Sequence, residues 1–282
     1  MISFFCMEGQ LITSTQNPKV KRVVALVQKS SFRRETGLFV VEGCREVQHC
    51  LDAGFEREAV FKCPEIINPH QTSLFQWEKM GQGNVNCYDV TPEVYAKMAF
   101  RGSTEGVLAV MRARTLSLAD LQTRLASVSN PLFVVLEKVE KPGNVGAVLR
   151  SADAAGADAV IVCDPLTDLY NPNLIRSSIG AVFTVPTVCC TSEDCIAWLK
   201  ERNVAILTAQ LQDSRSYYDA DMTGATAIVM GTESTGLTEQ WRQAADAHIR
   251  IPMQGRLDSL NVSVSAAILL FEAVRQRGGN GS

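Results

Sequence analysis

The second half of the chain alternates short β-forming runs with helical segments, and this alternation limits the possible folds more than any other feature of the sequence. The run LFVVLE at 132–137 has the continuous apolar character of a strand that is covered on both faces of a parallel sheet. Further strands are predicted at 158–163, 183–188, 204–210, 225–231 and 248–253, with helices at 144–157, 171–181, 192–202, 237–245 and over the apolar stretch near the end of the chain. The pattern predicts an α/β domain with a parallel sheet and helices on both faces.

The first half of the chain predicts a second, smaller α/β unit. Valines at helical spacing over 20–27 are followed by short buried runs such as GLFVVEG. Helices are predicted at 17–30, 45–55, 72–81 and 91–99, and strands at 37–43, 59–63, 85–90 and 106–113. A polar, helix-forming stretch ends before Pro131 and separates the two halves. We therefore expect a small domain at 1–114, a linker at 115–130 and a second domain at 131–282.

The composition is that of an ordinary soluble globular protein, with 46% apolar and 20% charged residues. No apolar run is long enough to cross a bilayer, and the opening residues lack a basic start and carry Glu8. We therefore expect no membrane span and no signal peptide, with a cytoplasmic location as the default. The 9 cysteines include no C-x-x-C pair, so we expect reduced thiols that serve as small apolar residues, and no metal site.

Charge is distributed unevenly along the chain, although the net charge is only −3. Residues 1–127 carry two more basic than acidic side chains, and residues 128–282 carry five more acidic than basic ones. The early basic side chains are Lys19, Lys21, Arg22, Lys29, Arg33, Arg34 and Arg45, against the acidic Glu35 and Glu42. A positive face of this kind attracts nucleic-acid phosphates without reading sequence. An ordinary solvated helix face is the alternative.

Ligands of open α/β sheets bind outside the carboxyl ends of the strands, so the loops after the strands are candidate sites. After the strand at 132–137, Gly143 and Gly146 permit close backbone approach, and Asn144 stands near a helix start. Arg150 follows Asn144 by six positions, nearly two helical turns, so we expect both side chains to project from one end and face of the helix. A helix N-terminus with an arginine can bind an anion. The alternative is a capped amphipathic helix with a surface arginine.

Two further loops carry unusual polar residues. In IVMGTESTGL, the spacing from Gly231 to Gly236 suggests a phosphate-binding loop, but the Lys-Ser/Thr that such a loop requires is missing. Glu233 would suit a cationic or hydroxyl-bearing partner, an intramolecular arginine or a plain surface turn. In GRLDSLN, Ser259 and Asn261 precede the last helix, where one of them is enough to cap it. That polar loop between two apolar segments either caps the helix or holds a ligand.

Taken together, these loops resemble the SpoU/TrmH family of RNA ribose 2′-O-methyltransferases, in the SPOUT superfamily. The resemblance covers about residues 131–277. Its carriers are PGNVGAVLRSADAAGAD, NPNLIRSSIGAVF, IVMGTESTGL and IPMQGRLDSLNVSVSAAILLFEAVRQ, in that order. The first half, with FVVEGCREVQHCLDAG, is similar to the substrate-binding domain of many members. Two alternatives remain: a nucleotide-dependent oxidoreductase, for which neither half has the dinucleotide fingerprint, and an RNA-binding module that does not respond to S-adenosylmethionine.

The resemblance implies a deep C-terminal trefoil knot that encloses S-adenosylmethionine in a bent form. In such a knot the polar loop is expected to be buried against the 231–237 turn and the strand end near Thr208 and Ala209. The implied cofactor contacts are Thr208, Ala209, Gly231, Ile251, Met253 and Leu260. The implied catalytic and RNA-positioning residues are Arg150, Asn144, Glu233, Ser259 and Asn261.

The resemblance also implies a partner and a substrate. Family members pair through the knot region, so we expect a homodimer, and Leu269, Leu270 and Phe271 would serve either that contact or the monomer core. Because the second half is acidic and attracts RNA poorly, we expect the basic first half to supply the contacts with RNA phosphates. The two-domain layout favours ribosomal RNA, and transfer RNA stays open. Arg150 is implied as a base or as an electrostatic activator of the ribose hydroxyl, and we favour the second role because arginine stays protonated.

Overall fold

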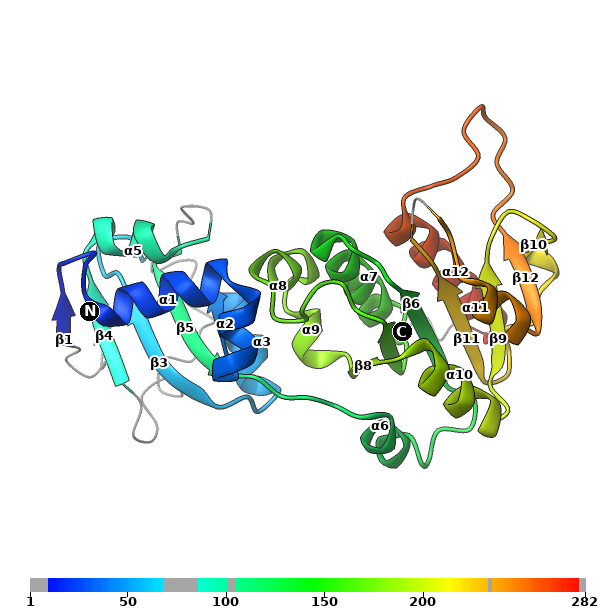
Figure 1. Ribbon diagram of the computed structural model, residues 1–282, viewed down its shortest axis with the longest axis horizontal. Helices are drawn as coiled ribbons and strands as arrows, with labels where there is room; N and C mark the ends of the chain where they lie inside the picture. The colour runs from blue at the N-terminus through cyan, green and yellow to red at the C-terminus, as the bar shows by residue number, and fades with distance from the viewer. Residues whose placement is uncertain (1–9, 68–85, 101–104, 233–234, 279–282) are drawn as a thin grey trace. The chain divides into compact units, whose positions relative to one another are not determined.

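The computed structural model describes residues 10–67, 86–100, 105–232 and 235–278. The opening residues, the predicted helix at 72–81 and Glu233 lie outside these ranges. The chain divides into two compact units (Figure 1). One unit comprises residues 1–114 with 169–184, and the other comprises 115–168 with 185–282.

The first unit contains, among its described residues, a five-stranded mixed sheet with the order β1-β4-β3-β5-β2. Its strands are β1 (Gln10–Ile12), β2 (Leu38–Glu42), β3 (Arg57–Lys62), β4 (Asn86–Val90) and β5 (Val107–Arg112). Its helices are α1 (Pro18–Gln28), α2 (Ser30–Thr36), α3 (Cys44–Asp52), α5 (Pro92–Met98), α8 (Pro172–Ser178) and α9 (Ala181–Thr184). The segment 169–184 joins this unit through Phe39, whose ring stacks on Tyr170 with 4.1 Å between centroids and on Phe183 with 5.9 Å.

Helix α1 shows why these segments fold as they do. Pro18 occupies the first turn and Asn17 accepts a hydrogen bond from the backbone N–H of Lys19 at 2.9 Å, which caps the helix. The apolar stripe of α1 is buried, as the spacing of valines predicted.

The second unit contains, among its described residues, a seven-stranded sheet in which every pair is parallel, with the order β10-β12-β9-β11-β6-β7-β8. The strands are β6 (Leu132–Glu137), β7 (Ala159–Cys163), β8 (Thr187–Cys190), β9 (Ala205–Ala209), β10 (Arg215–Ser216), β11 (Thr226–Met230) and β12 (Ala247–Arg250). The helices are α6 (Leu118–Arg124), α7 (Pro142–Ala154), α10 (Ser192–Glu201), α11 (Glu239–Ala244) and α12 (Val262–Gln276), with a 3-10 turn at Tyr217–Asp219.

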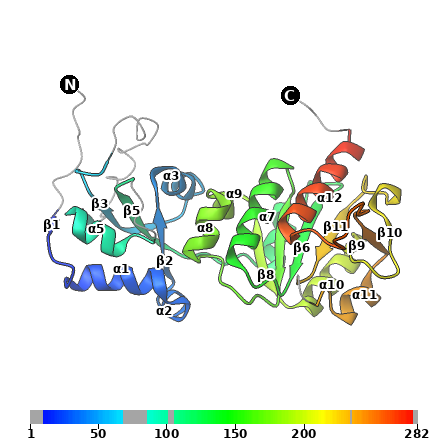
Figure 2. The same cartoon turned by 90° about the horizontal axis from the view of Figure 1, so that it is seen from above.

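Helices cover both faces of this parallel sheet, as predicted. Figure 2 shows α7 and α12 on one face and α10 and α11 on the other. All residues of β6, β7 and β11 are buried, which explains their continuous apolar sequences. The predicted α/β architecture with a smaller preceding domain is therefore confirmed, whereas the trefoil knot stays a prediction. Among the described residues, no helix has the length and apolarity that a membrane span requires.

Two predicted strand boundaries are wrong. The prediction of a strand at 183–188 fails because α9 ends at Thr184 and β8 begins only at Thr187, after Pro186, which has no N–H for a sheet. The prediction of a strand to Met253 fails because β12 ends at Arg250, two residues before Pro252.

Candidate functional site

A cavity of about 530 Å³ lies at the carboxyl ends of β9, β11 and β12 in the second unit. Three chain segments form most of its wall: the end of β9 with the next residues, the turn after β11, and the segment after β12. The described lining includes Ala209, Gln210, Met230, Gly231, Thr232, Ile249, Ile251, Met253, Ser259 and Leu260. The first residues of α12 close another side. Five of the six predicted cofactor residues thus border one cavity.

The turn after β11 is held tightly by its own backbone. A Cβ at Gly231 would lie 2.3 Å from the carbonyl carbon of Gly236, so only glycine fits there. Thr232 and Gly236 exchange backbone hydrogen bonds at 3.3 and 3.1 Å, and the hydroxyls of Thr232 and Thr235 are bonded at 2.7 Å. Gly236 has φ +69°, a left-handed conformation that glycine adopts without strain.

A buried carboxylate anchors the far end of this turn. Glu137, at the end of β6, is 1% exposed and accepts hydrogen bonds from the backbone N–H of Thr238 at 2.8 Å and from its hydroxyl at 2.6 Å. Thr238 is the N-cap of α11, so β6 fixes both the turn and the start of that helix. Sequence reasoning missed Glu137, although an acidic residue at the end of the apolar run LFVVLE was a visible signal.

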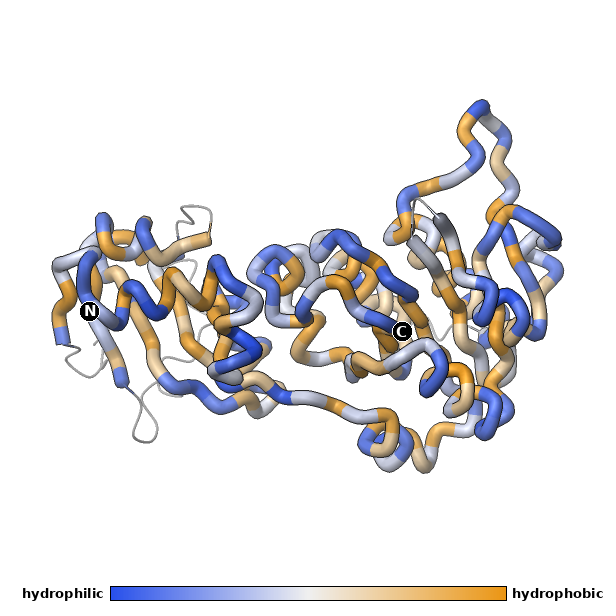
Figure 3. Tube along the Cα trace, viewed as in Figure 1, coloured by the Kyte–Doolittle hydropathy of each residue, from blue (hydrophilic) through white to orange (hydrophobic). Residues whose placement is uncertain are grey.

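The loop that leads from β12 to α12 behaves differently. It protrudes from the second unit in Figure 1 and mixes hydrophilic and hydrophobic residues in Figure 3. Residues 254–261 are all exposed, and the side chain of Leu257 is 75% exposed. The expectation that this loop is buried against the 231–237 turn is therefore wrong for the isolated chain. Its charged and polar residues favour water over the apolar interior.

The end of this loop meets the first turn of α7. The Asn261 side chain caps α12 by accepting a hydrogen bond from the Ser263 N–H at 3.0 Å, and its Nδ2 donates to Asn144 Oδ1 at 3.3 Å. Asn144 lines a second cavity of about 140 Å³, together with Gly231 and Thr232. Because these two residues also border the large cavity, the two cavities are neighbours. The Ser259 hydroxyl, on the wall of the large cavity, donates to Asp258 at 3.1 Å.

Arg150 lies apart from this arrangement. It is exposed in the middle of α7 and lines neither cavity. The prediction that Arg150 and Asn144 share one face is wrong, because six residues at 3.6 per turn leave two side chains about 120° apart around the axis and about 9 Å apart along it.

Two residues at the end of β9 differ in orientation. Thr208 is fully buried and lies outside the described lining of the cavity; its hydroxyl is 2.6 Å from His248 Nδ1 on β12. Gln210 lines the cavity, and its Nε2 donates to the carbonyl of Gln212 at 2.8 Å. That bond leaves Gln210 Oε1 buried without a hydrogen-bond partner among the described residues. A buried acceptor of this kind requires a donor, which a ligand can supply.

The basic stretch of the first unit is only partly available to a ligand. Arg33 is 5% exposed and donates to the carbonyls of Leu26 at 2.5 Å and Val27 at 3.1 Å, so it joins α2 to α1 rather than facing solvent. The other basic side chains of this stretch are exposed: Lys19, Lys21, Arg22, Lys29, Arg34 and Arg45. Of these, Arg22 pairs with Glu58, Arg45 pairs with Glu46, and Lys19 lies over the ring of Tyr88. The predicted basic face therefore excludes Arg33.

The helix after the polar loop is only partly apolar on its surface. Leu269 and Leu270 are buried in the monomer, at 1% and 0% exposure, so they are not free to contact a partner. Phe271 and Val264 remain about half exposed on the same helix, at 49% and 47%.

Comparison with known proteins decides the family. Residues 131–271 match the model of the SpoU rRNA Methylase family, and residues 17–109 match that of the MRM3-like substrate binding domain. The chain belongs to the SpoU rRNA methylase family.

Relatives extend this SpoU assignment over both units. A 23S rRNA (guanosine-2′-O-)-methyltransferase RlmB of Vibrio vulnificus is 38% identical over 68% of this chain and 79% of that protein. A 23S rRNA (uridine(2479)-2′-O)-methyltransferase of Streptomyces viridochromogenes is 28% identical over 94% and 92%. The AdoMet-bound crystal structure of an rRNA methyltransferase from Sinorhizobium meliloti has a TM-score of 0.83 and 30% identity, and covers 94% of this chain and 97% of that one.

Proposed function

We propose that this SpoU protein transfers a methyl group from S-adenosylmethionine to a ribose 2′-hydroxyl in ribosomal RNA. The cavity of about 530 Å³ at the strand ends carries this proposal, because the loops that form it are the segments that resemble the family. The two named relatives act on guanosine and on uridine of 23S rRNA by their names, so the reaction is shared while the target base differs. We therefore assign the reaction and the RNA class without a target nucleotide.

The residues that are present fit this cofactor. The cavity volume lies within the roughly 300–1,000 Å³ typical of small-ligand sites. Ala209, Gly231, Ile251, Met253 and Leu260 offer main-chain groups and apolar contacts for the adenosine. Thr208, behind them, would support this wall.

Polar groups of the cavity would fix the orientation of the cofactor. Gln210 Oε1 would accept a hydrogen bond from one of its N–H or O–H groups, since it has no protein donor among the described residues. Arg242 and Arg250 line the same cavity and suit its carboxylate.

On the substrate side, the protein must place a ribose hydroxyl in line with the methyl group and favour loss of its proton. The bound cofactor supplies a methyl group already activated by a sulfonium. Arg150 would contact the hydroxyl or a flanking phosphate and stabilise the developing negative charge on oxygen. Asn144 and Asn261, which contact each other, would orient the substrate, and Glu233 and Ser259 would fix the loop and the arginine.

The separation of Arg150 from both cavities supports a homodimer in which each Arg150 serves the cavity of the partner subunit. The exposed Phe271 and Val264 of α12, with Leu257 and Leu260 of the preceding loop, provide apolar surface for pairing through the second unit. A trefoil knot would keep the cofactor loops together, and a cytoplasmic location suits an enzyme of ribosomal RNA. The exposed Lys21, Lys29 and Arg34 of the first unit would hold RNA phosphates.

The deciding experiment maps 2′-O-methyl positions in RNA from cells with and without this protein. Loss of one or a few positions in ribosomal RNA is the expected result. A lost position in transfer RNA instead would correct the substrate, and identical maps would contradict the proposed activity. A thermal shift with S-adenosylmethionine separates an enzyme from a non-catalytic RNA-binding module, because a specific ligand stabilises the folded state.

A further inference from the structure

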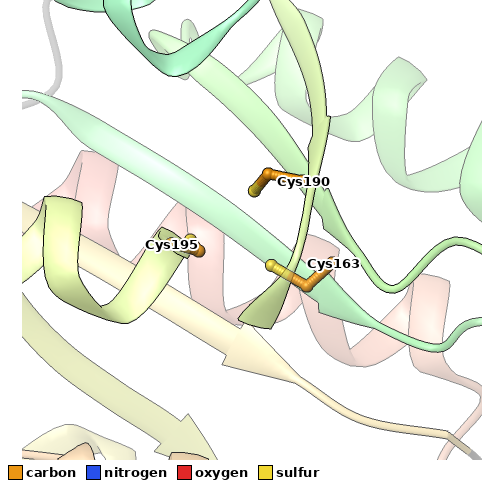
Figure 4. Close-up of side chains that lie close together, drawn as sticks. All are labelled: Cys163, Cys190 and Cys195. Carbon is orange, nitrogen blue, oxygen red and sulfur yellow. The ribbon is translucent and has the colours of Figure 1, made fainter. Parts of the chain in front are cut away.

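Three cysteines from separate elements of the second unit lie together. They are Cys163 at the end of β7, Cys190 at the end of β8 and Cys195 in the first turn of α10 (Figure 4). Their sulfur atoms all lie within 4.8 Å of one another. Parallel pairing sets Cys163 and Cys190 side by side in register, and the short connection between β8 and α10 brings Cys195 back to them.

The surroundings of the three thiols are apolar on one side and open on the other. Cys163 and Cys195 are fully buried within the core cluster that includes Val188 and Leu199. Cys190 is partly exposed, so an ion can approach from its side and keep a water molecule there.

The geometry suits a thiolate-bound metal ion. Zinc–sulfur bonds of about 2.3 Å in a tetrahedral site place sulfur atoms about 3.8 Å apart, which small side-chain rotations achieve from the observed arrangement. We propose that Cys163, Cys190 and Cys195 together bind one thiophilic d¹⁰ metal ion, zinc(II), with water as its fourth ligand.

Charge in the site favours a dication. Asp164 and Asp194 lie near Cys190 and make its surroundings negative. A complex of three thiolates has a net charge of −1 with zinc(II) and −2 with copper(I). Because the surroundings are negative, repulsion disfavours the copper(I) complex more than the zinc(II) complex.

The ion would join elements that position the methyl-transfer site. Cys163 is in register with Glu137, the carboxylate that holds Thr238. Its neighbour Asp164 accepts a hydrogen bond from the Ser192 hydroxyl at 2.6 Å, and that hydroxyl accepts one from Trp241 Nε1 at 3.0 Å. Metal binding would therefore stabilise β7, β8, α10 and α11 as one block.

Metal uptake by the reduced full-length chain tests this site. The protein is incubated with zinc(II) under a phosphine reductant, desalted and assayed for bound metal, and cobalt(II) is added in parallel to observe sulfur-to-metal charge transfer. Cys190→Ser is compared with Cys189→Ser, a matched control because Cys189 is the exposed neighbour on the same strand. We expect one zinc ion per chain, a rise in Tm and a charge-transfer band for the wild type and Cys189→Ser, and the loss of all three for Cys190→Ser.

X-ray absorption at the zinc edge identifies the atoms bound to zinc in the wild type, so its result does not depend on whether the variants fold. Three sulfur neighbours and one oxygen would support the site, and a shell of nitrogen and oxygen alone would overturn it. Preference for copper(I) with three sulfur neighbours would support the thiolate site and replace zinc as its occupant. Failure of the reduced wild type to retain any metal, or a Cys163–Cys190 disulfide without metal uptake, would overturn the proposal.

Discussion

The two sides of the candidate site are built in different ways. On the cofactor side, Gly231 and Gly236 touch backbone to backbone, and buried Glu137 holds the end of the turn. On the substrate side, Asn261 is exposed and Arg150 lies outside both cavities. We therefore propose that one chain builds its cofactor wall by itself, and that RNA, a second protomer or both complete the catalytic side.

Substitution of Arg150 separates the two sides most strongly. Arg150→Ala should lower methyl transfer by about 10²–10³-fold, the effect of removing one group that stabilises an oxyanion, and leave the Kd for S-adenosylmethionine unchanged. Single-turnover methylation and calorimetry measure the two quantities. Arg124→Ala, an exposed arginine on α6, is the control. Near-normal turnover of Arg150→Ala would remove this residue from the mechanism.

Mixed dimers show which subunit Arg150 serves. An Arg150→Ala subunit keeps its cofactor cavity, and a Gly231→Ala subunit keeps its arginine. When the two variants are mixed at a cofactor concentration too low to fill the Gly231→Ala cavity, activity should return, because one site then combines an intact cavity with the partner's arginine. A mixture that exchanges subunits but stays inactive would place Arg150 and the cavity of the same chain together.

Gly231→Ala should weaken the binding of S-adenosylmethionine. The added Cβ would meet the Gly236 carbonyl group at 2.3–2.4 Å, and overpacking of this kind costs about 1–3 kcal/mol. If the cofactor-bound turn bears this cost, S-adenosylmethionine binding should weaken about five- to 150-fold, measured by calorimetry. Gly255→Ala is the matched control, because a Cβ at Gly255 meets nothing within 4 Å. Equal affinities for the two variants would show that the turn does not shape the cofactor wall.

Gln210→Leu removes the buried acceptor Oε1 and should weaken cofactor binding less than Gly231→Ala does. Loss of one hydrogen bond of about 1 kcal/mol should weaken cofactor binding about fivefold. The exposed Gln243→Leu should leave the affinity unchanged. Unaltered binding by Gln210→Leu would assign the buried oxygen to some role other than cofactor recognition.

Substitutions on the basic face of the first unit should have the smallest effects, and these should appear in RNA binding. Each phosphate contact that Lys29→Ala or Arg34→Ala removes should lower the salt dependence of RNA binding by about 0.7–0.9 in the slope of log K against log salt. Arg33→Ala should instead lower the midpoint of urea denaturation, because its guanidinium joins two helices through buried carbonyls. RNA titrations at several salt concentrations check the first result, and an unchanged slope for both surface variants would exclude this face from binding.

Features that depend on local pattern were predictable from the sequence. Apolar runs identified β6, β7 and β11. The family resemblance, rather than local pattern, implied that Gly231, Ile251, Met253 and Leu260 share a site, and the fold does bring them to one cavity. Polar loop residues could not reveal whether their loop is buried or exposed, since both states use the same residue types. Residue spacing also placed Arg150 on the wrong face of α7.

Contacts between distant residues were beyond the sequence. The hydrogen bonds that Thr238 donates to Glu137 join positions 101 residues apart, and the burial of Arg33 depends on how α2 packs against α1. The cysteine cluster was not predicted, because the pairing of β7 with β8 creates it and the cysteines have no metal-binding spacing in the sequence.

The most direct measurement of the central claim is the position of the transferred methyl group. Purified protein, S-adenosylmethionine with a labelled methyl group and unmodified ribosomal RNA are combined, and the nucleosides are identified by mass spectrometry. The account predicts label on a ribose 2′-oxygen, at a single nucleotide or a few, and labelling about 10²–10³-fold slower with Arg150→Ala. Label on a base, or no label from a protein that binds the cofactor, would contradict it.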